Sequence, residues 1–541
     1  MSSPFSSLLG TNYCPEDDEV GEIKALLVEP SQRLKRLDDV IAGLQNALDQ
    51  LMEERARLSA HVDAHKALRS PVRRLPLDII QEIFVACIPT HRNCAMSALE
   101  APVLLGRICR SWRDISLSTP RLWSKIHIVE PTCPYNSVIA IFEEKLALRL
   151  ETTKTWLGRS GQCPLSISLQ STFDRTGFTL ETQQLLIDAL LPFAARWEHI
   201  TLTTLFSVLA TASHLTPADV PMLKSVSISE IHEPTQDTVR WHSLTFLRGP
   251  EIYSFHIMGS SFGPMELPLG WERLTDLSIA ERWMAGGPSL TSDMSFQVFS
   301  RCPKLRTCRL LVHDGLDLGY RAGEQDVLDL PALNSLDLQC VGTLSSTVHR
   351  LFGRLSFPHL RHCKLRGNSN RDDNISFAPF LAATPRLETL DINIELFTKP
   401  SLDSFLHGLA STIREIQINE FPICWREVGS DIFDDDILAS LTTSTDLALP
   451  CCPALQALEI NYCGSFFDQA LFDQALLRFI QSRALKRVVV HFARDMELDI
   501  CPKLDELVQG GLHMELTYPP PAVLQFSPWL GLPDAPHFTD P

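Results

Sequence analysis

Four stretches of the chain repeat one eight-residue pattern: residues 303–310 read PKLRTCRL, 331–338 read PALNSLDL, 358–365 read PHLRHCKL and 385–392 read PRLETLDI. Each copy begins with proline, has leucine at its third position and has apolar residues at its sixth and eighth positions. Apolar residues at every second position are typical of a β-strand with one buried face. The sequence therefore predicts a short strand at the end of each copy.

Less regular copies of this pattern extend over most of the chain. They begin at Trp197, Leu223, Ile252, Leu274, Ile413, Leu455 and Leu485. The apolar anchors at positions 305, 333, 360, 387 and 413 are 28, 27, 27 and 26 residues apart, which is the spacing of leucine-rich repeats. Helical apolar spacing fills the stretches between strands, at 348–355, 377–383, 402–409 and 471–481. We therefore expect an α/β fold over residues 129–516, a leucine-rich repeat-like solenoid (horseshoe) with strands on its concave face and helices outside.

Two regions depart from the repeat. The interval from Ile413 to Leu455 is 42 residues long and holds three successive aspartates at 434–436, so we expect a protruding insertion with a solvated acidic loop. Residues 517–541 contain seven prolines, which are incompatible with a regular helix or an inner strand. We expect this Pro-rich tail either to be flexible or to cap the solenoid.

The N-terminal region has a different periodicity. Residues 1–30 are rich in serine, proline and acidic residues and are predicted to be disordered. Over residues 31–66, apolar side chains recur in steps of three and four, which is a heptad seam interrupted by Arg55. They are Leu34, Leu37, Ile41, Leu44, Leu48, Leu51, Leu58 and Val62. The seam predicts either a homodimeric coiled coil or one amphipathic helix packed on the next domain, and the sequence favours neither.

Bulk properties narrow the class of protein. The chain has 541 residues and a net charge of −17, which disfavours binding to a nucleic-acid backbone. No stretch of about 18 apolar residues and no signal sequence is found, so we expect a soluble protein without membrane contact. Its 15 cysteines include no CxxC pair, and several lie at apolar repeat positions. They are expected to be reduced thiols in a cytoplasmic and/or nuclear protein.

Residues 71–128 differ from the repeats. Leu75-Pro76 opens an apolar helical stripe that contains Ile79-Ile80 and Ile83-Phe84. A second apolar run contains Leu104, Ile108-Cys109 and Trp112-Arg113, followed by the sequence PRLW at 120–123. A polar linker at residues 89–101 separates the two runs. A small helical domain is predicted, whose apolar residues are shared between its own core and a partner contact.

This segment resembles the F-box, and the whole arrangement is similar to fungal F-box proteins with irregular leucine-rich repeats. The resemblance implies that the segment docks on a Skp-family adaptor, which connects to a cullin-RING ubiquitin ligase. The linker at 89–101 is longer than the turn usual in that family. The contact residues that the resemblance implies are Leu75, Pro76, Ile79, Ile80, Ile83, Phe84, Leu104, Ile108 and Trp112.

Signals for catalysis and metal binding are weak. The sequence GSSFG at 259–263 matches a nucleophile elbow, but Pro264 and Pro268 exclude the helix that must follow it. His61 and His65 lack a third ligand nearby, and the aspartates at 434–436 lack the spacing of a calcium loop. We therefore expect no catalytic residue, metal or cofactor.

Two functions follow from these expectations. In the first, the protein is the substrate-recognition adaptor of a Skp–cullin–F-box ubiquitin ligase, and its solenoid binds a target protein whose identity the sequence does not give. In the second, it is a non-ligase interaction scaffold that dimerises through residues 31–66, an alternative that the long linker favours. Neither function requires the chain itself to be an enzyme.

Overall fold

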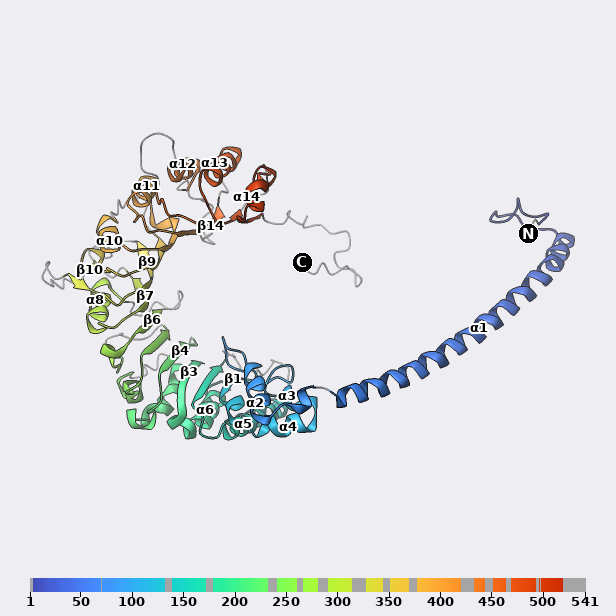
Figure 1. Ribbon diagram of the computed structural model, residues 1–541, viewed down its shortest axis with the longest axis horizontal. Helices are drawn as coiled ribbons and strands as arrows, with labels where there is room; N and C mark the ends of the chain where they lie inside the picture. The colour runs from blue at the N-terminus through green and yellow to red at the C-terminus, as the bar shows by residue number, and fades with distance from the viewer. Residues whose placement is uncertain are drawn as a thin grey trace. The chain divides into compact units, whose positions relative to one another are not determined.

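The protein is described by a computed structural model of mixed α/β architecture (Figure 1). Two units are distinguished, an N-terminal unit from Met1 to Ile83 and a sheet unit from Phe84 to Pro541. No described helix is both long enough and apolar enough to cross a membrane. The described residues are 3–69, 71–131, 139–171, 179–231, 241–259, 266–280, 290–313, 327–343, 351–368, 377–419, 433–442, 451–463, 469–492, 496 and 498–518.

The N-terminal unit consists mainly of one long helix, α1, from Asp17 to Leu68. The predicted disorder up to residue 30 is wrong for residues 17–30, since the helix begins 14 residues earlier. Asp17, Asp18 and Glu19 form its first turn, where negative charge is stabilised by the exposed N–H groups of the helix end. Pro30 lies inside α1 and removes one backbone donor without ending the helix. A short 3-10 turn, Pro71–Arg74, leads to α2, Leu77–Ala86, which crosses into the sheet unit.

The sheet unit is built on one parallel sheet of 14 strands whose spatial order follows the sequence. The sheet is open, with β1 and β16 as its terminal strands. A separate two-stranded pairing joins β8 (Leu328–Asp329) to β10 (Leu355–Ser356). The strands of the large sheet are β1 Lys125–Val129, β2 Leu165–Gln170, β3 Trp197–Thr204, β4 Ser225–Glu230, β5 Ser254–Met258, β6 Asp276–Ala280, β7 Thr307–His313, β9 Ser335–Thr343, β11 His362–Asn368, β12 Thr389–Asn393, β13 Glu415–Asn419, β14 Ala457–Cys463, β15 Arg487–Phe492 and β16 His513–Thr517.

Two rows of apolar side chains run across the sheet and form its core. All eleven apolar pairs expected from the repeat pattern lie on strands, and each residue pairs in register with its equivalent on the next strand. Ile126 and Ile128 on β1 and Ile167 and Leu169 on β2 continue the same rows. From β1 to β15 every member of both rows is buried. At about 1.5–3 kcal/mol for each fully buried aliphatic side chain, these rows are the main stabilising feature of the sheet.

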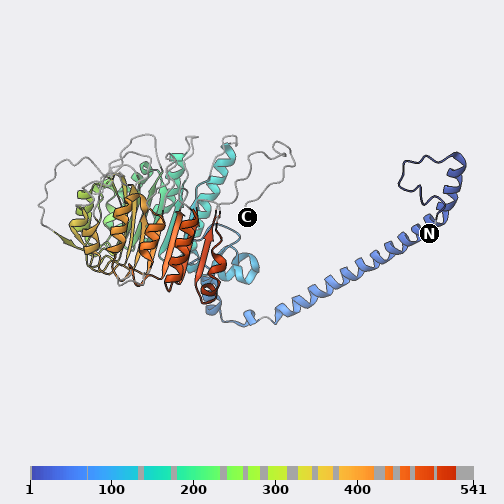
Figure 2. The same ribbon diagram turned by 90° about the horizontal axis from the view of Figure 1, so that it is seen from above.

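Helices and 3-10 turns connect the strands and cover the outer side of the sheet, whereas no helix of the described residues lies on its inner side (Figures 1 and 2). The helices expected near 377–383, 402–409 and 471–481 are present as α10, α11 and α13. In the stretch expected to be helical at 348–355, residues 348–350 lie outside the described residues, residues 351–353 are helical as expected, and Leu355 starts β10, where it pairs with β8. The α-helices are α3 Leu105–Ile108, α4 Arg110–Leu117, α5 Ile139–Arg159, α6 Thr179–Leu190, α7 Phe206–Leu209, α8 Ser292–Arg301, α10 Ala378–Ala383, α11 Lys399–His407, α12 Asp435–Leu441, α13 Gln469–Ser482 and α14 Asp505–Gln509.

The acidic run in the long interval begins a helix, so the predicted solvated loop at 434–436 is wrong. Asp434 is the N-cap of α12, and its carboxylate accepts a hydrogen bond from the Ile437 N–H at 3.2 Å. Lys399 bridges the run, with its Nζ 2.6 Å from Asp436 and also bonded to Asp434. Carboxylates at a helix start and a neighbouring ammonium explain why three aspartates are tolerated together.

The polar linker at residues 89–101 covers the edge of β1. Ala95 forms a parallel bridge with His127, and the His127 N–H donates to the Cys94 carbonyl at 2.7 Å. Asn93 donates to the Ser168 hydroxyl on β2 at 3.1 Å, and the Cys94 side chain is fully buried. The linker therefore occupies backbone groups that an uncovered terminal strand would expose. Because β1 itself begins at Lys125, the predicted boundary between helical segment and repeats at residue 128 falls inside the sheet.

The paired rows make one stability prediction. Leu338→Ala removes a fully packed side chain from the centre of the second row and should lower the free energy of unfolding by about 2–5 kcal/mol. Asn334→Ala, at an exposed position of the same repeat, should change it by less than about 0.5 kcal/mol. Urea unfolding curves would measure both, and equal effects would contradict the proposed role of the row.

Candidate functional site

Helix α2 presents an apolar face to solvent. Ile79 and Ile83, one turn apart, are each 44% exposed, and Pro76 before the helix is also exposed. Leu75 and Ile80 are half-buried. Of the predicted contact residues in the N-terminal unit, Ile79 and Ile83 are therefore the best placed to contact another protein.

Phe84 does not belong to this exposed surface. Its side chain is fully buried, and its ring lies against Trp112 of α4 with the two centroids 4.8 Å apart. Trp112 is half-buried. The prediction that Phe84 contacts a partner is therefore wrong for this conformation, because helical spacing does not distinguish the core-facing side of an apolar helix from the exposed one.

Helices α3 and α4 carry the second group of predicted contact residues. Leu104 and Ile108 are 41% and 54% exposed, whereas Leu105 between them is buried. The Arg113 side chain ties the two helices together by donating to the Gly106 carbonyl at 2.8 Å. Leu104 and Ile108 thus form an exposed apolar pair on a braced helical turn of the sheet unit.

Trp123 joins this helical segment to the repeats. Its indole N–H donates to the Ser116 carbonyl at 2.8 Å, and its ring meets Trp156 of α5 edge-on at 4.8 Å between centroids. Arg159 places its guanidinium 4.7 Å from the Trp123 ring centre. The helical segment from residue 84 onward therefore shares a core with the first repeat, and Trp123 is structural.

The inner side of the sheet is a second candidate surface, and its first six strands are largely uncharged. The central row of side chains that points away from the helices consists there of His127, Ser168, Thr201, Ser227, His256 and Ser278. Burial lowers the pKa of His127 and His256, and also of His199 in the adjacent row. This half of the inner face therefore offers hydroxyl and neutral imidazole groups at pH 7.

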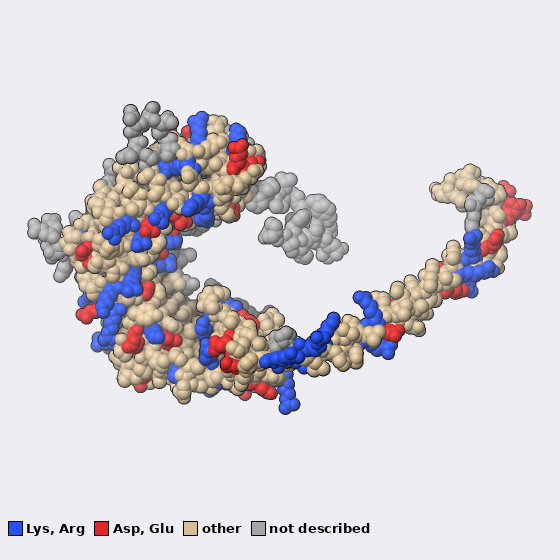
Figure 3. All heavy atoms as spheres, in the orientation of Figure 1, with Lys and Arg blue, Asp and Glu red and all other residues tan. Residues whose placement is uncertain are grey.

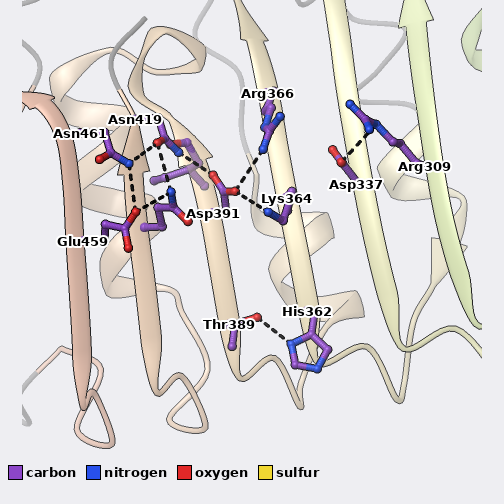
Figure 4. Close-up of polar contacts among 12 residues, drawn as sticks. Arg309, Asp337, His362, Lys364, Arg366, Thr389, Asp391, Asn419, Glu459 and Asn461 are labelled. Carbon is purple, nitrogen blue, oxygen red and sulfur yellow. Dashed lines mark hydrogen bonds and ion pairs between the residues drawn. The ribbon is translucent and has the colours of Figure 1, made fainter. Parts of the chain in front are cut away.

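From β7 to β12 the same row carries charges of alternating sign (Figure 4). Arg309 faces Asp337 at 3.4 Å between Nε and Oδ2, and Lys364 faces Asp391 at 3.1 Å. Asp391, whose side chain is only 8% exposed, also accepts from Arg366 at 3.4 Å and from Asn419 at 2.6 Å. Asp391 is thus the centre of a polar network across β11, β12 and β13.

The network continues to the next strands through amide side chains. Asn461 donates to the Asn419 side chain at 2.8 Å, and Gln417 donates to Glu459 at 3.0 Å. Arg487 on β15 pairs with Glu459 at 2.8 Å. Figure 3 shows basic and acidic side chains interspersed over the face of the sheet unit in view. The C-terminal half of the inner face is therefore charged but locally compensated.

Sequence reasoning did not identify this network, although a signal for it exists. In each Pro-led copy the residue between the two buried apolar positions is Arg309, Asp337, Lys364 or Asp391. Once the copies are stacked in register these residues become neighbours, and their alternating signs predict pairing. Aligning the four copies and comparing the residues at the same position of each copy would have identified this polar network.

The remaining candidate catalytic and metal-binding residues do not form a site among the described residues. Ser260 and Ser261 of the elbow-like sequence lie outside the described residues, as do residues 519–541 of the Pro-rich tail. No cluster of three potential metal ligands occurs among the described residues, and His61 and His65 are exposed on α1.

The cysteines at repeat positions behave as small apolar side chains. Burial raises the pKa of Cys302 to about 12 and the pKa of Cys308 and Cys363 well above the usual range. Their thiols are therefore protonated and unreactive at neutral pH. Cys501 is only half-buried.

No family model matches the chain, and no curated protein shows significant similarity to it.

Asp391 should be the most sensitive residue of the inner face. Asp391→Ala leaves Lys364 and Arg366 without their shared carboxylate, and should lower the free energy of unfolding by about 1–3 kcal/mol. In a background with Lys364→Met and Arg366→Met, the same substitution should lower the free energy of unfolding by less, because the two cations that Asp391 neutralises are absent. Urea unfolding of the four chains would test this, and an undiminished cost in that background would show that Asp391 acts independently of these cations.

Proposed function

We propose that this protein is the substrate-recognition adaptor of a Skp–cullin–F-box ubiquitin ligase, with an F-box at residues 71–128 and a leucine-rich repeat-like solenoid behind it. The observation that carries the proposal is the combination of two features in one chain. A segment with the F-box residue pattern exposes Ile79 and Ile83 on α2, and an in-register array of parallel strands follows it. The resemblance supplies the reaction, and the architecture is compatible with an adaptor.

Each unit offers exposed apolar residues for docking. Ile79 and Ile83 on α2 of the N-terminal unit are accessible for burial against a Skp-family adaptor, and so, separately, are Leu104 and Ile108 around α3 of the sheet unit. Such apolar anchors contribute most when a partner excludes water from them. Phe84 supports α2 from within the core.

The target protein binds the inner face of the sheet. Among the described residues no helix lies on this face, and its central row of side chains is polar from β1 to β14. An adaptor of this kind promotes ubiquitin transfer by holding the target near the enzyme, without chemistry of its own. It would act in the cytoplasm or nucleus, where the ligase and its targets reside.

The scaffold function is the second candidate, and one observation favours it. The linker at 89–101, longer than is usual for an F-box, covers the edge of β1 through residues 93–95, which gives it a structural role independent of any ligase. A chain that binds no Skp-family adaptor but still captures protein on its inner face would be a scaffold.

The docking assignment predicts loss of adaptor binding on charging α2. Ile79→Asp with Ile83→Asp should reduce recovery of a Skp-family adaptor in co-purification by at least about tenfold, because two buried anchors would become charged. The matched control is Leu185→Asp on α6, a side chain that is 47% exposed. Unchanged recovery in the double variant, with the circular dichroism spectrum preserved, would remove the adaptor function and leave the scaffold.

The inner-face assignment predicts a separation of the two binding activities. Thr201→Trp with Ser227→Trp fills adjacent positions on β3 and β4 and should block a target sterically while the adaptor is retained. Affinity purification with the ligase held inactive, followed by mass spectrometry, would compare the proteins recovered by wild type and variant. Identical sets of target proteins would place target binding away from these strands.

A further inference from the structure

Helix α1 carries an apolar stripe that is exposed from Leu27 to Val62. Leu34, Leu44 and Leu51 are 61%, 66% and 64% exposed, and the other leucines and isoleucine of the seam are at least half exposed. Exposed apolar surface of this extent is rare in a monomeric protein and marks an interaction site. This stripe therefore requires a partner that covers it.

The seam is longer than the heptad pattern over residues 31–66 alone. Because α1 begins at Asp17, the same register extends back through Leu27 and Ile23 to Val20. Positions a and d then number fourteen over residues 20–65, and only Pro30, Arg55 and His65 among them are not aliphatic. The aliphatic members are Val20, Ile23, Leu27, Leu34, Leu37, Ile41, Leu44, Leu48, Leu51, Leu58 and Val62.

The length of the seam selects the kind of partner. At 1.5 Å per residue, residues 20–65 span about 69 Å, whereas a small domain is about 30 Å across. A second helix of the same length and the same heptad register would cover the whole stripe by knobs-into-holes packing. A second copy of this chain supplies such a helix.

The composition of the seam is suited to two strands. Leucine occupies the four successive d positions 37, 44, 51 and 58, while the a positions hold valine or isoleucine at 20, 41 and 62 and leucine at 27, 34 and 48. The β-branched a positions combined with leucine at d favour a two-stranded coiled coil. Arg55 is a single charged residue at an a position, a device that fixes register at some cost in stability.

Flanking charges are self-complementary. In a parallel pair, Glu19 and Arg33 of one helix face Lys24 and Asp38 of the other; in an antiparallel pair aligned end to end, Arg33 faces Glu54. Residues five apart do not face each other on one helix, so these particular pairs can form only between two helices, whereas Arg33 and Asp38 also have opposite charges on their own helix at Glu29 and Lys35. We propose that α1 pairs with α1 of a second copy, making the protein a coiled-coil homodimer.

Dimerisation would give the assembly two inner faces. A target with two matching segments, or a target that is itself oligomeric, would be held by both, and the second contact forms at high effective concentration. This consequence holds for a ligase adaptor and for a scaffold alike, so the dimer does not rest on the proposed F-box.

The dimer is tested by charging the seam of the full chain. Leu44→Asp with Leu51→Asp should convert a species of two chains into a monomer, measured by sedimentation equilibrium. The matched control is Asn46→Asp with Ala60→Asp, which adds the same two carboxylates to the opposite, exposed side of α1. The control should remain dimeric. A monomeric wild type at about 100 µM, or dissociation of the control as well, would overturn the proposal.

Cross-linking gives a second readout that does not depend on disrupting α1. In a background with the exposed Cys14, Cys87 and Cys109 replaced by serine, Leu58→Cys should form an interchain disulfide with itself if the helices are parallel. If they are antiparallel, it should form one only when mixed with Leu27→Cys chains. Either product supports pairing through this seam, and the absence of both would overturn it. The seam variants should still recover a Skp-family adaptor, which separates this test from that of the F-box.

Discussion

The structure of the sheet unit depends on one constraint, which is that no repeat can bury its own apolar face. The two apolar side chains of each strand point toward the helices. They are buried only when a neighbouring strand lies on each side and a helix or turn packs against them. The two rows from Ile126 and Ile128 to Val488 and Val490 satisfy this requirement at every step. Variable helices, 3-10 turns and loops between strands are tolerated because they do not change the register of these rows.

The same constraint determines the inner face. In-register stacking that aligns apolar residues also aligns the polar residues between them, at the strand spacing of about 4.8 Å. Like charges directly opposite each other at this distance are destabilising, and neighbouring positions on β7 to β12 accordingly alternate in sign. Asp391 is tolerated at 8% side-chain exposure because two cations and an amide contact it. The surface available to a target is therefore partly fixed by the stability of the sheet.

How far the sequence predicts this molecule depends on whether the relevant signal is local. The eleven pairs of apolar strand residues were predicted correctly because the alternation of apolar and polar residues that indicates a strand lies within eight consecutive residues. The predicted start of the helix is too late because the serine, proline and acidic residues of 1–30 indicate disorder, whereas α1 begins at Asp17 and continues through Pro30. The role of residues 89–101 was not predictable, since the bridge from Ala95 to His127 joins residues 32 apart with no shared pattern. For the candidate site, the exposed Ile79 and Ile83 and the buried Phe84 share one apolar stripe, and only tertiary packing separates them.

The linker bears on how an adaptor of this kind would work. Between Phe84 and β2 the chain is held by the contact of Phe84 with Trp112, the packing of Trp123 on Trp156, and the bridge from Ala95 to β1. Leu104 and Ile108 are therefore connected to β1 through packed side chains of the same unit. Proximity catalysis requires a target to be held at a restricted distance from the transferring enzyme. A linker that covers the sheet edge leaves Leu104 and Ile108 exposed, and its length is thus compatible with the docking of a partner there.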